Sequence, residues 1–202
     1  MQKNAGKKTL LLSVLMSAPG PIVVGLGLLA GKSSTQLADF FRRSAELLAI
    51  ICSFAIYCMT ENDQGDRKER LERMANLFVG LAMCVGGLIM IALALWAPSE
   101  EKGNVIPGLI IALLGVIANT LFWRKYTRLN RQSPNAILAV QARLYRAKAL
   151  VDGCVTTALL AVALFPASAA AAALDAVGSV IVAVYLVWCG AKTIGETRKK
   201  TV

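Results

Sequence analysis

Apolar residues in this chain are gathered into six blocks, separated by short polar stretches. A helix needs about 20 consecutive apolar residues to cross the roughly 30 Å of hydrocarbon in a bilayer. Each block reaches that length, and none shows the alternation typical of a strand. The pattern predicts six membrane-spanning helices at residues 10–30, 35–59, 74–96, 105–123, 137–165 and 169–191.

The predicted fold is therefore all-α: a polytopic six-transmembrane-helix bundle that forms a single transmembrane domain over residues 1–202, with the lipid bilayer as its surroundings. Composition agrees, because 56% of the residues are hydrophobic and 17% are charged. A soluble domain averages about 45–50% apolar and about 25% charged residues. We expect no cytoplasmic domain after residue 191, since only a short basic tail follows the sixth block.

The first block contains Pro19-Gly20-Pro21 near its middle. A proline inside a helix removes one backbone hydrogen bond and bends the axis, so this span is expected to be kinked. The apolar run continues beyond Pro21 and is too long for the hydrophobic region of a secretory signal peptide.

The net charge of +10 is distributed unevenly along the chain. Basic residues gather before the first block, after the second and fourth, and at the C-terminus, whereas the other connections carry only Lys32 and Lys102. Cytoplasmic loops carry an excess of Lys and Arg, so both termini are predicted to be cytoplasmic, in a protein of the cell (plasma) membrane. No basic surface with interleaved aromatic residues lies outside these flanks, which argues against nucleic acid as a partner.

Several classes of function are excluded by residues that the chain does not contain. It has no histidine, so Ser-His-Asp and Cys-His catalytic arrangements are impossible, and we do not expect an enzyme. The five cysteines lie within the apolar blocks and show no C-x-x-C spacing, so they are expected to be buried apolar side chains rather than disulfides or metal ligands. No motif for a cofactor is present, and none is expected.

Two charged motifs interrupt the apolar blocks: Arg42-x-x-x-Glu46 in the second and Lys148-x-x-x-Asp152 in the fifth. Residues four apart share one face of a helix, so each motif presents a base and an acid to the same neighbour. A charge at the centre of a bilayer costs roughly 2.5–3.5 kcal/mol even on the insertion scale. Charges of that cost are expected to serve a function or to pair with one another.

The charged motifs and their order along the chain resemble the transmembrane domain of the cation diffusion facilitator (cation efflux) family of metal:proton antiporters. The resemblance covers the whole chain and rests on short fragments that occur in the family's order: Ala38-Asp39-Phe40-Phe41-Arg42-x-x-x-Glu46, Arg70-x-Glu72-x-x-Ala75, Ser133 with Leu138, Lys148-x-x-x-Asp152, and Leu174-Asp175-Ala176. It implies a six-helix fold and the transport of a cation in exchange for protons.

In that family, the two motifs converge on a tetrahedral site of histidine and aspartate that holds zinc or a similar ion. Here Arg42, Glu46 and Lys148 stand at three of those positions, and only Asp152 is kept. A guanidinium has no lone pair to offer, and an ammonium has none until it loses its proton. The chain therefore lacks the three or four donors that zinc needs, and no zinc site of the family type is expected.

The residues that stand in place of the family's ligands balance one another in charge, with two cations and two carboxylates in the two motifs. If the two motifs converge between antiparallel helices as the resemblance implies, residue 42 faces residue 152 and residue 46 faces residue 148. We therefore expect two pairs across the helices, Arg42–Asp152 and Glu46–Lys148, whose four charges sum to zero without any ion.

Two mechanisms follow, and the sequence leaves both open. In the first, a secondary active transporter binds a cation between Glu46 and Asp152, Lys148 releases the exchanged proton, and Arg42 is a fixed counter-charge. In the second, the four residues form a structural lock in place of the metal, and the protein is a non-transporting structural or partner-binding membrane protein. A third and minor option is anion transport, with Arg42 and Lys148 as ligands.

Secondary polar residues complete the candidate set. Asp39 is expected to pair with Arg43 near the outer end of the second span, and Asp175 to cap the sixth helix or to line an outer vestibule. Asn76 and Asn119 are expected to form hydrogen bonds between helices. The small residues of the sixth span predict close packing, either within one protomer or in a homodimer through membrane helices.

Overall fold

The computed structural model describes residues 2–30, 34–60, 65–96, 106–164 and 169–199. Within these ranges the secondary structure is helical, which together with the family assignment below confirms the all-α prediction. The helices are α1 (Gln2–Ser17), α2 (Pro19–Ala30), α3 (Ser34–Met59), α4 (Asp66–Trp96), α5 (Ile106–Gln132), α6 (Ala136–Leu164) and α7 (Ala169–Lys199).

The first predicted span consists of α1 and α2, which are separated at Ala18. The last hydrogen bond of α1 runs from the N–H of Ala18 to the carbonyl oxygen of Val14, at 2.9 Å. Pro19 then opens α2, as a residue without an N–H does most readily in the first turn of a helix. The expected kink is thus a complete break between two helices.

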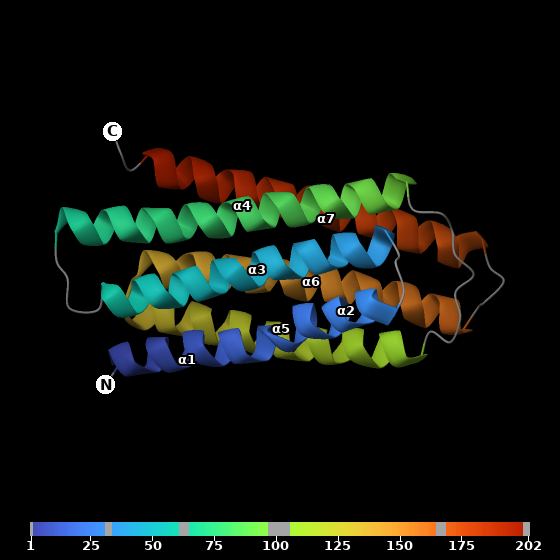
Figure 1. Cartoon of the computed structure of the whole chain (residues 1–202), viewed down its shortest axis with the longest axis horizontal. Helices are drawn as coiled ribbons and strands as arrows, with labels where there is room; N and C mark the ends of the chain where they lie inside the picture. Colours follow the sequence, from blue (N-terminus) through green and yellow to red (C-terminus); the bar gives the residue numbers. More distant parts are fainter. Residues whose placement is uncertain (1, 31–33, 61–64, 97–105, 165–168, 200–202) are drawn as a thin grey trace.

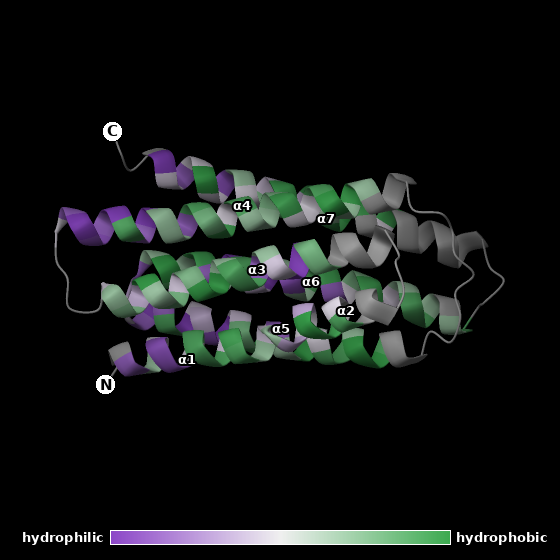
Figure 2. Ribbon diagram, in the orientation of Figure 1, coloured by the Kyte–Doolittle hydropathy of each residue, from purple (hydrophilic) through white to green (hydrophobic). Residues whose placement is uncertain are grey.

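The helices run side by side along one axis, as Figure 1 shows. α4 packs closely on α7 and also on α3, and α5 packs closely on α6. α1 and α2 lie against α3, and α1 also contacts α5. Both termini lie at the same end of the bundle. Hydrophilic residues cluster at that end, and hydrophobic residues predominate along the middle of the bundle, where a few hydrophilic residues of α3 and α6 also lie (Figure 2).

The contact between α4 and α7 is made close by glycines. A Cβ atom on Gly190 would lie 2.6 Å from the carbonyl oxygen of Gly80, and one on Gly87 would lie 2.7 Å from the carbonyl oxygen of Ala183. Small residues let helix backbones approach in this way inside a membrane, where lipid offers no hydrophobic drive for association. Glycines of α4, and not only the small residues predicted to pack in the sixth span, therefore contribute to this contact.

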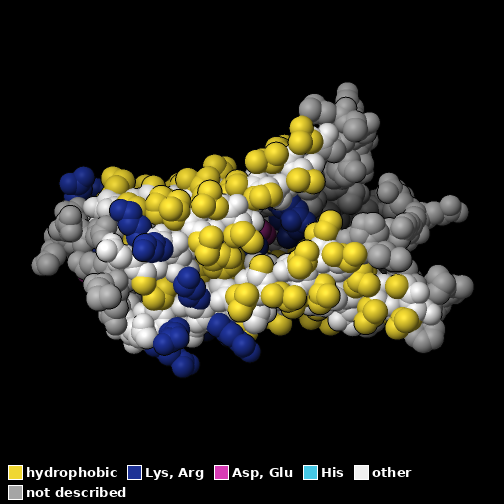
Figure 3. Space-filling model, turned by 90° about the horizontal axis from the view of Figure 1, so that it is seen from below, with side chains coloured by type: hydrophobic (Ala, Val, Ile, Leu, Met, Phe, Trp, Pro, Cys, Tyr) yellow, Lys and Arg dark blue, Asp and Glu magenta, His cyan; other side chains and the backbone are white. Residues whose placement is uncertain are grey.

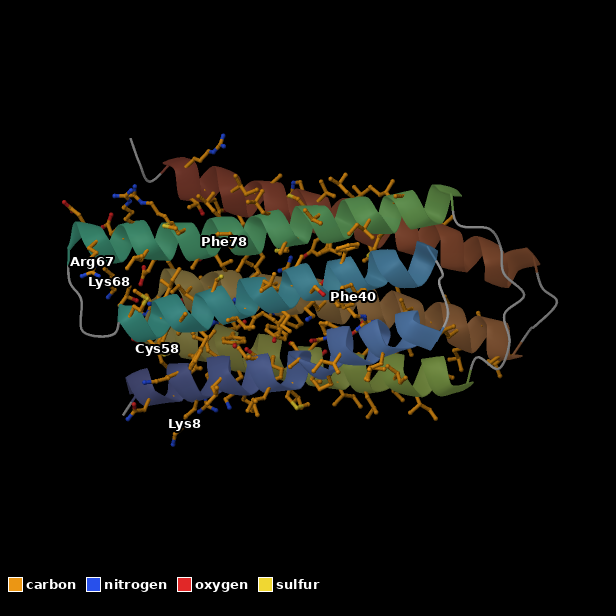
Figure 4. All side chains as sticks on the ribbon, viewed as in Figure 1. Lys8, Phe40, Cys58, Arg67, Lys68 and Phe78 are labelled. Atoms are coloured by element: carbon orange, nitrogen blue, oxygen red, sulfur yellow. The ribbon has the colours of Figure 1, made fainter. Side chains whose placement is uncertain are left out.

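Large apolar side chains cover the outside of the bundle. Three described helical segments are long and apolar enough to cross a membrane: Asp66–Ala92, Leu109–Gln132 and Val180–Arg198. Exposed leucines, isoleucines and valines line α1, α5 and α7, which is the expected arrangement when the solvent is hydrocarbon. The basic side chains of Lys8, Arg67 and Lys68 lie near the end of the bundle that carries the termini (Figure 4).

α6, which carries the second charged motif, is capped by Asn135. The side-chain oxygen of Asn135 accepts hydrogen bonds from the N–H groups of Ile137 (2.9 Å) and Leu138 (3.2 Å). This is the usual role of an asparagine at a helix N-cap. The Asn135 amide also donates to Glu72 on α4 at 3.1 Å, which ties the start of α6 to its neighbour.

Candidate functional site

The four charged residues of the two motifs line a single cavity of about 400 Å³. α3 contributes Arg42 and Glu46, and α6 contributes Lys148 and Asp152. The break between α1 and α2 and one face of α5 complete the wall. Figure 3 shows acidic and basic side chains inside a recess whose rim is largely hydrophobic.

Glu46 lies between two cations. One carboxylate oxygen is 3.1 Å from the Lys148 ammonium across the helix interface, and the other is 3.5 Å from the Arg42 guanidinium on the same helix. Only 5% of Glu46 is exposed, so both interactions take place largely away from water. The predicted pair between Glu46 and Lys148 is therefore present. The Lys148 ammonium also lies 5.3 Å from the centre of the Tyr145 ring, a distance typical of a cation–π contact.

The second predicted pair is wrong in its geometry. The described ion pair of Arg42 is with Glu46 and not with Asp152. Asp152 instead accepts a hydrogen bond of 2.6 Å from the side-chain amide of Asn119 on α5. Gly115 leaves room for this contact between α5 and α6, because a Cβ on Gly115 would lie 2.5 Å from the same oxygen of Asp152.

Asn119 thus makes a hydrogen bond between helices, as predicted for an asparagine inside an apolar span. Asn76 differs, because its side-chain oxygen has no hydrogen-bond partner among the described residues although the residue is buried. It lines a separate cavity of about 420 Å³ between α4, α6 and α7. The side chains of Asp39 and Asp175 lie outside the described residues, so their predicted roles are not placed here. Arg43, the expected partner of Asp39, lines the cavity with the four charged residues.

An aromatic layer that the sequence did not reveal lies directly below the site, toward the end with the termini. Phe122 and Tyr126 of α5 pack on Tyr145 of α6, with ring centres 5.0 and 5.4 Å from that of Tyr145. The hydroxyl of Tyr126 donates to Ser13 at 2.8 Å, and the hydroxyls of Tyr145 and Ser17 are 3.3 Å apart. Both tyrosines are almost completely buried, so this layer closes the described bundle beneath the charges.

The cavity extends in the opposite direction. Its lining includes Ile111 in the first turns of α5 and Leu159 in the last turns of α6, both toward the end of the bundle away from the termini. The charged side chains can be seen in a recess on the side of the bundle in Figure 3, while the buried tyrosines lie between them and the end with the termini.

The donors in the cavity suit some cations and not others. Among the described residues, no three side chains of His, Cys, Asp or Glu lie together in a way that would hold a metal ion. Glu46 and Asp152 supply carboxylate oxygens, the ligands preferred by hard cations such as Mg²⁺ and Ca²⁺ and by ammonium groups. The site therefore offers oxygen donors and a nearby ammonium, not the closed nitrogen and sulfur shell of structural zinc.

Comparison with known families settles the identity of this bundle. The model of the cation efflux transmembrane domain matches residues 10–199, which is nearly the whole chain. The chain belongs to the cation efflux (cation diffusion facilitator) family. No curated protein matches it closely enough to count as a relative.

This cation efflux domain is thus an integral membrane protein with a transport fold and not an enzyme. The family assignment makes a cation the expected substrate class. The two charged motifs lie where the resemblance places the family's metal ligands, and the fold brings them into one cavity. What distinguishes this member is the chemistry of that cavity, because Arg42 and Lys148 bring positive charges where ligands are expected.

Proposed function

We propose that this cation efflux protein is a secondary active transporter that exchanges a cation for a proton by alternating access. Glu46 and Asp152 bind the cation, Lys148 carries the proton, and Arg42 is a fixed counter-charge. The observation that carries the proposal is the cavity of about 400 Å³ in which Asp152 and the Glu46–Lys148 pair meet.

The exchange follows from competition for one carboxylate. A cation that enters between Glu46 and Asp152 competes with the Lys148 ammonium for the oxygen of Glu46 that lies 3.1 Å away. Lys148 then releases its proton to the cavity, since an ammonium without its partner in a poorly hydrated site is disfavoured. Entry of one monovalent cation and departure of one proton leave the summed charge of the site unchanged. A divalent ion leaves one additional positive charge unless a second proton departs.

The size of the cavity favours a hydrated or organic cation over a bare ion in a closed cage. Sites for small molecules in proteins measure about 300–1,000 Å³, and this cavity lies at the lower end of that range. The substrate class is therefore a small organic cation, or a hard metal ion that keeps part of its water shell.

The second candidate function is the salt-bridge lock. Its support is the direct contact of Glu46 with both Lys148 and Arg42, at 3.1 and 3.5 Å. In that case the protein transports nothing and serves a structural or partner-binding role. Asp152 argues against a complete lock, because its described partner is the neutral amide of Asn119.

The orientation and assembly that accompany this function are also proposals. The basic flanks support a cytoplasmic location for both termini in the cell membrane. In that orientation Ile111 and Leu159 of the cavity lining lie toward the outside, and we infer that cargo is released and protons are taken up on that side. Association of two protomers through membrane helices remains a prediction.

A flux assay in proteoliposomes tests the proposal. A pH-sensitive dye inside the vesicles reports protons while divalent metals, monovalent metals and organic cations are added outside. We expect a proton signal that depends on one class of cation and is lost in Asp152→Asn and in Glu46→Gln. Glu69→Gln is the matched control, because Glu69 is exposed and pairs with Arg73 far from the cavity.

The lock predicts a different result. Folded, inserted protein that gives no signal with any cation would remove the transport function. An unchanged signal in both carboxylate variants would remove Glu46 and Asp152 from the cation site.

A further inference from the structure

Basic side chains from two distant parts of the chain meet on one face of the bundle. Lys8 lies on α1, and α5 carries Arg124, Lys125, Arg128 and Arg131 in its last turns; all five are exposed. We call these five residues the α1–α5 basic patch. Figure 3, which views this face, shows basic side chains gathered over one end and hydrophobic side chains over the rest.

The patch has no acidic counterpart on its own helices. Neither α1 nor α5 contains an aspartate or a glutamate. The neighbouring helices on the other side of the bundle differ, since α4, α6 and α7 combine their cations with acids. There, Arg73 pairs with Glu69 at 3.0 Å, and Glu196 accepts from Arg143 at 2.9 Å and lies 3.9 Å from Lys192. A general excess of positive charge on cytoplasmic loops does not explain why α4 and α7 carry acids that pair with cations, whereas α1 and α5 carry cations and no acid.

The position of the patch fits the headgroup region of a bilayer. On α1, the exposed Leu11, Leu12 and Leu15 lie within two turns after Lys8, and on α5 the exposed Leu121 lies three residues before Arg124. These apolar side chains mark where the hydrocarbon begins. The helical rise of about 1.5 Å per residue spreads the four basic residues of α5 over roughly 10 Å, enough to cross one headgroup layer of about 5–8 Å and reach the water beyond it.

We propose that the α1–α5 basic patch binds the headgroups of anionic phospholipids in the leaflet at the end with the termini. Arg124, Arg128 and Arg131 share one face of α5, because they are spaced by four and three residues. A guanidinium binds a phosphate through two parallel hydrogen bonds, so this face suits a row of phosphodiesters. Each basic residue close to an anionic surface strengthens the attraction by roughly fivefold. This binding site is independent of the proposed transport.

Trp123 provides a reporter beside the patch, since it directly precedes Arg124. A Trp96→Phe/Trp188→Phe variant leaves Trp123 alone, and lipids with brominated chains quench tryptophans that they contact. Quenching by brominated phosphatidylglycerol, compared with brominated phosphatidylcholine, gives the relative affinity of the two lipids at that place. Trp188 on α7 is the matched reporter for the neutralised side, in a Trp96→Phe/Trp123→Phe variant; it is exposed, and Lys192 lies 5.2 Å from its ring centre.

We expect phosphatidylglycerol to be favoured on the order of threefold or more at Trp123 and hardly at all at Trp188. Arg124→Gln/Arg128→Gln should bring the ratio at Trp123 close to one. High salt should lower the same ratio in protein with all charges present, since it screens charges at the surface. Equal preferences at both tryptophans, no preference at Trp123, or a ratio insensitive to both charge removal and salt would overturn the proposal.

Discussion

The ammonium of Lys148 on α6 lies 3.1 Å from a carboxylate oxygen of Glu46 on α3. These two helices otherwise approach one another at few residues, since α3 packs mainly on α4 and α6 mainly on α5. The pair is therefore a principal direct link across the centre of the protein. Any movement that separates α3 from α6 must break it or replace it with another charge, which connects cation binding to the shape of the bundle.

The Glu46–Lys148 pair should behave as a unit in stability measurements. Lys148→Met leaves Glu46 with one fewer partner in a buried position, and we expect the free energy of unfolding to fall by about 3–5 kcal/mol. Glu46→Gln should also destabilise the protein, because it leaves the Lys148 charge without its partner. The double variant should recover much of the loss, measured by denaturant unfolding in detergent micelles. Strictly additive effects would show that the two side chains are not coupled.

Gly115 should be essential for the position of Asp152. Gly115→Ala places a methyl group 2.5 Å from a carboxylate oxygen of Asp152, which must then move. Misplacement of a binding group by about 1 Å can lower activity by up to about a hundredfold, so we expect a loss of roughly ten- to hundredfold in cation flux. Gly153→Ala, next to Asp152 on α6, is the control, because no atom lies within 4 Å of its added methyl group. Equal flux in both variants would contradict this role.

The packing of α4 on α7 should depend on Gly190. In Gly190→Ala, the new methyl group would lie 2.6 Å from both the Gly80 carbonyl oxygen and the sulfur of Cys84. A backbone cannot retreat as cheaply as a side chain, so we expect a loss of about 1–3 kcal/mol in the free energy of unfolding. Gly195→Ala on the same helix meets nothing within 4 Å and should be neutral or stabilising by up to about 1 kcal/mol. Thermal unfolding of the two variants, compared with the original protein, checks this difference.

The cavity should be accessible from the end of the bundle opposite the termini. In a variant without the five native cysteines, Val155→Cys places a thiol in the cavity wall and Leu144→Cys places one in the fully buried layer below. We expect a membrane-impermeant thiol reagent, added on that side, to label residue 155 and not residue 144. A transported cation should slow the labelling of residue 155. Labelling of residue 155 only from the side of the termini would reverse the direction of opening.

The sequence determined the elements and their chemistry. Six apolar blocks predicted the helices, and Pro19 and Pro21 predicted the interruption of the first span, since a missing N–H has the same effect in any fold. The pair of Glu46 with Lys148 was also predictable. Once the two motifs are assumed to converge between antiparallel helices, their spacing shows which residues face each other.

The tertiary structure decided which partner each remaining side chain reaches. Asp152 was expected to meet Arg42, and instead it bonds to Asn119 in a space that Gly115 leaves open. The rotation of the neighbouring helix and its distance determine which partner Asp152 reaches. Neither can be predicted from the sequence around Asp152. The aromatic layer of Phe122, Tyr126 and Tyr145 escaped prediction for the same reason. The spacing of residues along one helix shows which side chains share a face of that helix. Only the packing of the bundle decides which helix faces meet, and therefore which side chains line the cavity and which close it.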